Sequence, residues 1–281
     1  MPIKFGTDGW RAIISDEFTF ANLRHVAKAI ADYLLETRGT STAPVVVGFD
    51  TRFLSDRYAL EVSRVLADHG LPVYLSKSDC PTPALAYAIK HLGALGGVMI
   101  TASHNPPRYN GVKFKGCHGG PAMPDEMRKI EKILERNLAD GLAAEAKDWA
   151  FSDLDQQYQG IVRFDPMPAY LEHIRTMVDF EAISASRLHV AVDSMYGAGR
   201  GYIMTLLQEA GCEVIELHGE MNPGFAGIHP EPIGRNLGDL MALMSQGYYD
   251  IGLAVDGDAD RIGAVDAKGN FVDPHRIFSL T

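Results

Sequence analysis

PVVVGFD, residues 44–50, is an apolar run of strand length that follows a segment with helical periodicity. In residues 20–38, apolar side chains recur at positions 23, 26, 27, 30, 31, 34 and 35, which is the spacing of one helix face. Gly39 then provides a stop signal. A short apolar run beside such a helix indicates a strand buried on both faces, so this stretch predicts an α/β fold.

The same alternation of helical and strand patterns continues in two series, separated by the polar stretch 139–163. We therefore predict two consecutive α/β domains, residues 1–150 and 151–281, each with a mixed or mostly parallel sheet covered by helices. The predicted strands are 44–50, 71–76, 97–101, 112–115, 188–193, 213–217 and 250–255. The predicted helices are 20–38, 57–69, 82–91, 124–138, 167–178, 201–210 and 237–246.

Composition and charge restrict the class of partner. The 281 residues carry a formal net charge of -10, which gives no overall basic field to attract a nucleic-acid backbone or an anionic membrane. The start of the chain, residues 1–6, has no apolar core of signal-peptide length, and no later stretch has the apolar length of a membrane span. Cys80, Cys117 and Cys212 are widely spaced, which predicts neither a disulfide framework nor a zinc site. We expect a cytoplasmic protein with a small-molecule partner; the oligomeric state is left open.

An acidic loop, DGDADR at residues 256–261, follows the predicted strand 250–255. Asp256, Asp258 and Asp260 alternate with small residues, so a curved loop can turn all three carboxylates to one side. Such a donor set suits a hard, oxygen-ligated cation, and three aspartates leave positions on Mg²⁺ for a phosphate oxygen. An EF-hand is excluded because Arg261 and Ala267 stand where it needs Gly and an acid. The alternative is a solvated acidic turn.

A serine loop, TASHNPP at residues 101–107, follows the predicted strand 97–101. We expect the Ser103 hydroxyl to be exposed and fixed, because polar residues after a strand face ligands at the sheet edge. His104, Lys113 and the acidic loop could together supply proton transfer and charge compensation. The flanking residues do not fit a Gly-x-Ser-x-Gly nucleophile elbow. Taken alone, Ser103 is more often an ordinary turn serine.

Three stretches together resemble the α-D-phosphohexomutase family, in its phosphoglucomutase and phosphomannomutase branch: FGTDGWR at 5–11, TASHNP at 101–106 and DGDADR at 256–261. They occur in the family's order. The resemblance implies that Ser103 carries a phosphoryl group in the active enzyme. It also implies a Mg²⁺ ion held by Asp256, Asp258, Asp260 and an oxygen of phosphorylated Ser103.

The resemblance implies further roles for five residues. Thr7 and Arg11 are similar to the family's phosphate-proximal opening, and Arg261 is similar to its arginine after the acidic loop. His104 and Lys113 are similar to the polar groups beside the serine. Each has a plainer alternative, because His104 could be a turn histidine, Lys113 a strand-edge lysine and Arg11 a surface charge.

The implied reaction moves phosphate between O1 and O6 of a hexose phosphate, glucose or mannose, through a hexose 1,6-bisphosphate. It is an isomerisation by intramolecular phosphotransfer, in which positioning and charge stabilisation dominate. Two alternatives stay open at this point. One is a phosphoglucosamine mutase, and the other is a non-catalytic binding protein with the same fold.

Members of this family have four domains, with a sugar-reading loop in the third and a phosphate-gripping loop in the fourth. Neither loop is found in the 281 residues, which stop just after Pro274 has opened a further helix. We therefore expect the first two domains only, as an N-terminal fragment with poor or absent turnover.

Overall fold

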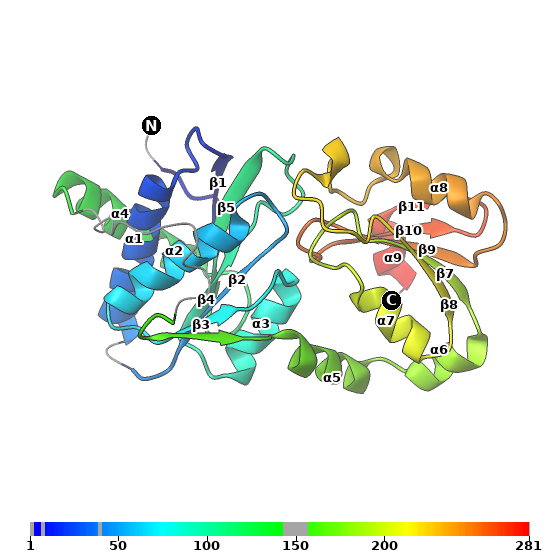
Figure 1. The fold of residues 1–281 in the computed structure, drawn as a ribbon, viewed down its shortest axis with the longest axis horizontal. Helices are drawn as coiled ribbons and strands as arrows, with labels where there is room; N and C mark the ends of the chain where they lie inside the picture. The colour runs from blue at the N-terminus through cyan, green and yellow to red at the C-terminus, as the bar shows by residue number, and fades with distance from the viewer. Residues whose placement is uncertain (1–2, 7–8, 39–40, 143–156, 281) are drawn as a thin grey trace. The chain divides into compact units, whose positions relative to one another are not determined.

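The computed structural model describes residues 3–6, 9–38, 41–142 and 157–280, which form two compact units (Figure 1). The first unit comprises Met1–Asp50, Leu54–Ala102 and Arg108–Met167, and the second comprises Thr51–Phe53, Ser103–Pro107 and Pro168–Thr281. By its contacts, the serine loop thus belongs to the second unit. The predicted boundary at residue 150 lies outside the described residues and stays a prediction.

The first unit is built on a mixed sheet. Its strands are β1 (Trp10–Ile13), β2 (Val45–Phe49), β3 (Val73–Ser76), β4 (Gly96–Ile100), β5 (Tyr109–Gly116) and β6 (Ile161–Phe164). They are ordered β1-β5-β4-β2-β3-β6, with β5 antiparallel to its two neighbours and the other pairs parallel. The strands predicted here are confirmed, although β5 is longer than expected. The sequence analysis did not predict β1 and β6.

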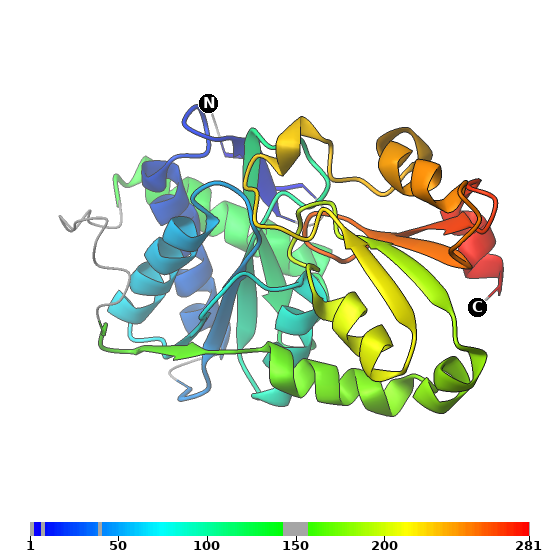
Figure 2. The same cartoon turned by 45° about the vertical axis from the view of Figure 1, so that its right-hand side comes forward.

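Helices cover both faces of this sheet, because successive side chains of a strand point to opposite sides. Val45 and Val47 pack into a core with the first, second and fourth helices, whereas Val46 packs against Leu85 and Ile89 of the third. Figures 1 and 2 show the same division. The helices, all predicted, are α1 (Phe20–Arg38), α2 (Ser55–Asp68), α3 (Thr82–His91) and α4 (Pro124–Ala139).

The second unit has its own mixed sheet. Its strands are β7 (His189–Asp193), β8 (Glu213–Leu217), β9 (Ile251–Val255), β10 (Ile262–Asp266) and β11 (Phe271–Val272). The order is β11-β10-β9-β7-β8, in which β9, β7 and β8 run parallel and β10 is antiparallel to β9 and β11. The three parallel strands are those that the sequence predicted.

Alternating side chains of β7 again divide between two cores. Val190 and Val192 pack with Leu207, whereas Ala191 packs with Leu240 and Met244 on the other side of the sheet. The helices are α5 (Met167–Met177), α6 (Phe180–Ser186), α7 (Tyr202–Glu209), α8 (Gly238–Met244) and α9 (Pro274–Leu280). Of these, only α6 was not predicted.

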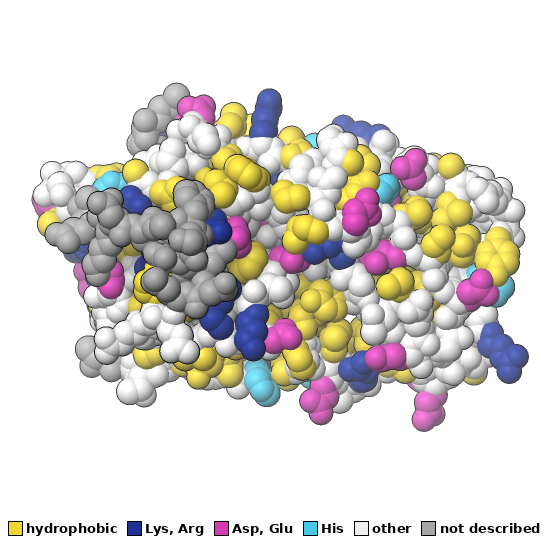
Figure 3. Space-filling model, in the orientation of Figure 1, with side chains coloured by type: hydrophobic (Ala, Val, Ile, Leu, Met, Phe, Trp, Pro, Cys, Tyr) yellow, Lys and Arg dark blue, Asp and Glu magenta, His cyan; other side chains and the backbone are white. Residues whose placement is uncertain are grey.

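On the face drawn in Figure 3, acidic and basic side chains are interspersed. Among the described residues, no helix combines the length and the apolar character that crossing a bilayer requires. The three cysteines are free thiols, of which Cys80 and Cys212 are buried and Cys117 is exposed.

Candidate metal centre and serine loop

The three aspartates lie in the connection between β9 and β10. Val255 and Ile262 are antiparallel partners at the base of this connection, so residues 256–261 form the loop of a β-hairpin. One oxygen from each of Asp256, Asp258 and Asp260 lies within 4.8 Å of the other two. The structure therefore brings the three carboxylates together, whereas their role as metal ligands stays a prediction.

The Asp256 carboxylate is fixed on both oxygens. Its Oδ1 accepts hydrogen bonds from the backbone N–H groups of Asp260, at 3.0 Å, and Arg261, at 3.1 Å. Its Oδ2 accepts a hydrogen bond from Ser103 Oγ at 2.9 Å. Burial, with the nearby charges of Asp258 and Asp260, raises the pKa of Asp256 to about 8. A cation bound beside this carboxylate would make its ionised form less unfavourable.

The serine loop is also a hairpin connection, because β4 and β5 pair in antiparallel register. Ser103 has a φ of 53°, in the left-handed region that a non-glycine residue enters at a cost of about 1 to 3 kcal/mol. The prediction of an exposed hydroxyl is wrong, since Ser103 is only 1% exposed. Its Oγ is covered because it points inward to Asp256.

Glycine is required where the two loops approach each other. A Cβ added to Gly257 would lie 2.6 Å from the carbonyl oxygen of Ser103. A Cβ added to Gly197 would lie 2.8 Å from the carbonyl oxygens of both Asp256 and Gly257. The next residue, Ala198, donates its N–H to Gly257 O at 2.9 Å. The acidic loop is thus packed against backbone on two sides.

Arg52 and Thr51 belong to the site but were missed by the sequence analysis. They follow β2, and the Arg52 guanidinium donates hydrogen bonds to carbonyl oxygens of the serine loop. Thr51 Oγ1 donates to the carbonyl oxygen of Tyr196 at 2.9 Å. Their position directly after a buried strand is the signal that could have identified them.

A buried polar network in the first unit anchors the strand ends from which these loops leave. Asp50 accepts hydrogen bonds from Ser55 Oγ at 2.9 Å and from Thr101 Oγ1 at 2.7 Å. Asn110 donates to Ser55 Oγ at 2.9 Å. Buried polar groups that satisfy one another in this way specify a single arrangement of the backbone.

A second network holds the turn that contacts the acidic loop. Asp193, at the end of β7, accepts hydrogen bonds from Met195 N–H at 2.9 Å and from His218 Nδ1 at 2.8 Å. The His218 backbone oxygen in turn accepts the Tyr196 N–H. The hydrogen bond to Asp193 raises the pKa of His218 above its usual value. Sequence periodicity does not predict the contact between Asp193 and His218, because the two residues meet only when β7 and β8 pair.

The other predicted residues fall into three groups. His104 lies beside Ser103, with Nδ1 3.4 Å from Ser103 Oγ, and Arg261 is exposed with Nε 4.0 Å from Asp260 Oδ1. Arg11 and Lys113 lie on the paired strands β1 and β5 of the first unit. Thr7 lies outside the described residues.

Lys113 is 1% exposed, which excludes the alternative of a solvated lysine at a strand edge. A lysine is almost never fully buried unless it has a partner for its charge. The burial is therefore better explained by a task for the ammonium group than by solubility. The task itself stays a prediction.

The donor set fits a divalent cation. Opposite ligands of an octahedral Mg²⁺ ion lie about 4.2 Å apart, which is twice its usual distance to oxygen. The three carboxylate oxygens are already gathered within a comparable span, and two of the three aspartates are buried. All donors are hard oxygens, including the adjacent Ser103 Oγ. Softer metals that prefer nitrogen or sulfur would find no such ligand among these side chains.

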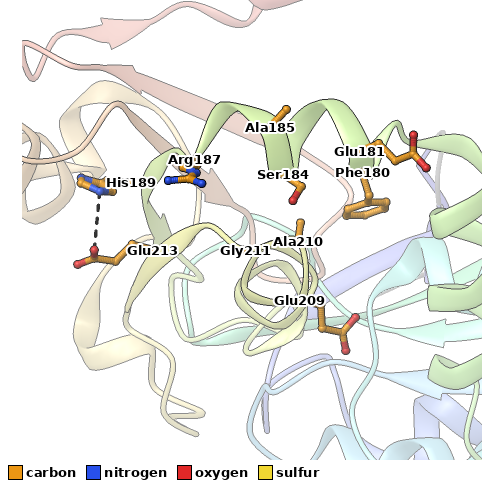
Figure 4. A pocket seen from close by; sticks show the side chains of 10 residues that line it. All are labelled: Phe180, Glu181, Ser184, Ala185, Arg187, His189, Glu209, Ala210, Gly211 and Glu213. Atoms are coloured by element: carbon orange, nitrogen blue, oxygen red, sulfur yellow. Dashed lines mark ion pairs between the residues drawn. The ribbon is translucent and has the colours of Figure 1, made fainter.

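A cavity of the second unit lies elsewhere. It has a volume of about 980 Å³, and Figure 4 shows that its walls come from α6, the end of α7 and neighbouring strands. His189 and Glu213 form an ion pair there at 3.7 Å. Its lining includes none of the predicted site residues that the structure describes. This cavity is therefore separate from the aspartate cluster.

Two family models match the chain. "Phosphoglucomutase/phosphomannomutase, alpha/beta/alpha domain I" matches residues 2–140, and domain II of the same family matches residues 168–269. Together they cover most of the chain, including the serine loop and the aspartate cluster. The match thus includes both loops of the site.

Similar proteins carry mutase names. A phosphoglucomutase/phosphomannomutase of Thermococcus kodakarensis is 34% identical over 98% of the chain and 58% of its own length. A phosphoglucosamine mutase of Alkaliphilus oremlandii is likewise 34% identical, over 98% and 58%. A Thermus thermophilus structure assigned as a phosphomannomutase is 41% identical with a TM-score of 0.87, over 98% of this chain and 59% of that one.

The chain spans a little over half of the length of these relatives. Within that span the similarity is continuous and includes both units. The matching models, the relatives and the shared fold agree, and the chain belongs to the phosphoglucomutase/phosphomannomutase family.

Proposed function

We propose that Ser103 carries the phosphoryl group in a phosphohexomutase reaction. The reaction would move phosphate between O1 and O6 of a hexose phosphate, with glucose or mannose as the sugar. The observation that carries the proposal is the 2.9 Å hydrogen bond from Ser103 Oγ to Asp256, beside two further carboxylates. A nucleophilic oxygen next to a cation site is what phosphoryl transfer requires.

Two transfers complete the proposed reaction. In the first, the bond between phosphorus and Ser103 Oγ breaks, and a bond forms from phosphorus to the free hydroxyl of the hexose phosphate. The hydroxyl proton leaves, and Ser103 Oγ regains a proton. The resulting hexose 1,6-bisphosphate turns round, and the bond between its other phosphorus and the sugar oxygen breaks as Ser103 Oγ loses its proton and bonds to that phosphorus. The sugar oxygen takes a proton and becomes the free hydroxyl of the product. His104 Nδ1, at 3.4 Å from Ser103 Oγ, is our candidate to exchange that proton.

We propose Mg²⁺ as the cofactor, held by Asp256, Asp258, Asp260 and an oxygen of phosphorylated Ser103. When bound, Mg²⁺ polarises the transferring phosphoryl group and compensates its charge. The chain would favour binding of the cation by holding the three carboxylates in one loop. The two backbone hydrogen bonds to Asp256 Oδ1 leave its Oδ2 directed at Ser103.

Four cationic or polar residues complete the proposal. Thr7 and Arg11 would contact phosphate at the opening of the site. Lys113 and Arg261 would balance the charge that three aspartates and a phosphate bring together. The half-exposed position of Arg261 suits a group that meets a substrate arriving from solvent.

A phosphoglucosamine mutase is the second candidate. The relative with that name is as similar to the chain as the phosphoglucomutase/phosphomannomutase, at 34% identity over the same share of the chain. Both sugars would use the same serine and the same cation. Rates on glucose, mannose and glucosamine phosphates, measured with the chain as part of a full-length enzyme, separate the two candidates.

The test of the proposal is transfer of phosphate to Ser103. The 281-residue chain is incubated with glucose 1,6-bisphosphate and Mg²⁺, and peptides are analysed by mass spectrometry. We expect one phosphoryl group, on Ser103, and release of a glucose monophosphate. Chelation of the cation should prevent the reaction.

Two variants control this experiment. Ser103→Ala should accept no phosphate. Ser15→Ala is the matched control, because Ser15 is the other serine with a left-handed backbone, at a φ of 67°, among the described residues. It should be labelled like the wild type. Phosphate on another residue, or labelling that survives Ser103→Ala, contradicts the proposal. Mg²⁺ binding that is lost in Asp258→Asn, without any phosphate acceptance by the wild type, favours a non-catalytic binding protein.

A further inference from the structure

The Arg52 side chain is buried, with 2% of its surface exposed, and its guanidinium reaches three peptide groups of the serine loop. Nη2 donates hydrogen bonds to the carbonyl oxygen of Ser103 at 2.5 Å and to that of Asn105 at 2.7 Å. Nη1 donates to the carbonyl oxygen of Pro106 at 2.9 Å. The guanidinium carbon lies 5.0 Å from the ring centroid of Phe225. The group is therefore held between an aromatic face and the backbone of the loop.

An arginine is suited to this position for a geometric reason. Its planar guanidinium presents five N–H donors in a rigid fork, so it can bind several carbonyls at once, whereas a lysine ammonium acts as a compact point charge. The contacts are made with backbone oxygens, so they constrain the path of the chain directly. One of those oxygens, on Ser103, is the atom that a Cβ added to Gly257 would meet first, at 2.6 Å. Arg52 thus acts at the contact between the serine loop and the acidic loop.

We propose that Arg52 is a positioning residue for phosphoryl transfer at Ser103. By binding the three carbonyl oxygens, it holds Ser103 in the left-handed conformation, with a φ of 53°, that directs Oγ to Asp256. The inference rests on the proposed function, because it assigns Arg52 a part in the same reaction. Arg52 itself does not need to touch the sugar or the transferring phosphoryl group.

Positioning and simple stabilisation have different consequences. A residue that only stabilises the fold changes the population of folded chain but not the rate of the folded molecule. A residue that positions the nucleophile changes the rate of the folded molecule, since a misplacement of about 1 Å can cost about 100-fold. The comparison must therefore be made at a temperature where circular dichroism shows every variant to be folded.

The experiment compares Arg52→Met and Arg52→Lys with the wild type in the 281-residue chain. The first readout is the rate of Ser103 phosphorylation by saturating glucose 1,6-bisphosphate with Mg²⁺. The second is amide hydrogen exchange of the peptide covering residues 101–110, measured without any phosphoryl donor. We expect Arg52→Met to slow labelling by about 100-fold and to increase exchange in that peptide. Arg52→Lys should fall in between, because it keeps the charge but loses the fork.

Arg24→Met is the matched control. Arg24 is a partly buried arginine of the first unit whose guanidinium contacts Glu61, so its replacement also removes a partly buried cation and its hydrogen bond. It should lower stability and leave both readouts at wild-type values.

The two readouts separate failure of this inference from failure of the proposed function. If the wild type is labelled and Arg52→Met matches it in rate and exchange, the positioning role is wrong. If the wild type is not labelled, the proposed phosphoryl transfer is wrong. Amide hydrogen exchange alone then tests whether Arg52 holds the serine loop in place. Increased exchange in residues 101–110 then supports its role in holding the loop, and unchanged exchange overturns it.

Discussion

Asp256 is the side chain on which the two loops converge. One oxygen receives two backbone N–H groups of its own loop, and the other receives the Ser103 hydroxyl. This arrangement places a buried carboxylate next to two others, which is unfavourable without a counter-charge. The raised pKa of Asp256, about 8, expresses that cost and gives it a measurable consequence.

The cation-free chain should lose stability as the pH rises from about 4 to about 8. The folded state holds the Asp256 proton more tightly than the unfolded state, because the pKa of Asp256 is about 8 when folded and near 3.8 when unfolded. The contribution of this proton to the free energy of unfolding is therefore fully present below pH 3.8 and is lost as the pH rises through about 8. Urea unfolding at pH values across this range, with chelator present, measures the effect.

The same experiment has two controls and a linked result. Asp256→Asn should reduce this pH dependence, whereas replacement of the exposed Asp16 by Asn should leave it unchanged. Mg²⁺ binding near pH 7 should release up to about one proton, because ligands must be deprotonated. A wild-type chain whose stability rises over this range, with no proton release, would show that the charge of Asp256 is already compensated.

Single residues of the site were predictable where a local pattern carried the chemistry. Asp256, Asp258 and Asp260 were found because three acids with small spacers after a strand are unusual. Arg52 and Asp193 were missed because each looks like an ordinary polar residue near the end of a strand. Their importance comes from partners far along the chain, 51 residues away for Arg52 and Ser103, and 25 for Asp193 and His218.

At the scale of elements, the site consists of two hairpin loops. The serine loop joins β4 to β5, and the acidic loop joins β9 to β10. A hairpin fixes both ends of its loop in neighbouring strands, so the loop has few ways to move. The close contact at Gly257 then sets the separation of the two loops.

Gly257→Ala should destabilise the chain by about 1 to 3 kcal/mol and weaken Mg²⁺ binding, because its Cβ would overlap the Ser103 carbonyl group. Gly238→Ala is the matched control. Gly238 begins α8, and nothing lies within 4 Å of an added Cβ, so the same change should be neutral or stabilise by up to about 1 kcal/mol. Urea midpoints and calorimetric Mg²⁺ titration give both quantities. Equal effects of the two substitutions would exclude a steric role for Gly257.

The long helices and buried parallel strands were predicted well from the sequence. Their apolar positions follow a single period over enough residues to be distinctive, as in α1 and β2. The strands that were missed are short or lie in mixed polar sequence, such as β1, β6 and β11. Pairing with a neighbour, rather than intrinsic pattern, makes these segments strands.

On the scale of the molecule, each unit has its own hydrophobic cores, and the two sheets share part of their strand order. In both sheets an antiparallel strand, β5 or β10, flanks three parallel strands in the order β4-β2-β3 or β9-β7-β8. The sequence suggested only that both units alternate helices and strands. The common order became visible once the pairing of the strands was known.

Separate cores predict separate responses to cavity-forming substitutions. Leu85→Ala removes a fully buried side chain from the first unit, and Leu240→Ala does the same in the second. Each should cost about 2 to 5 kcal/mol. Amide hydrogen exchange should rise mainly in the unit that contains the substitution, and only Leu240→Ala should weaken Mg²⁺ binding. A uniform rise through both units would instead indicate one cooperative folding unit.

The bond between Ser103 and Asp256 joins residues 153 positions apart, and this spacing has a consequence for synthesis of the chain. At typical translation speeds of about 5 to 20 residues per second, about 8 to 30 s separate the appearance of the two residues on the ribosome. The strands of the first sheet can pair during that interval, while Ser103 still lacks its acceptor. A nascent chain therefore passes through a period in which Ser103 has been synthesised but the three aspartates of the acidic loop have not.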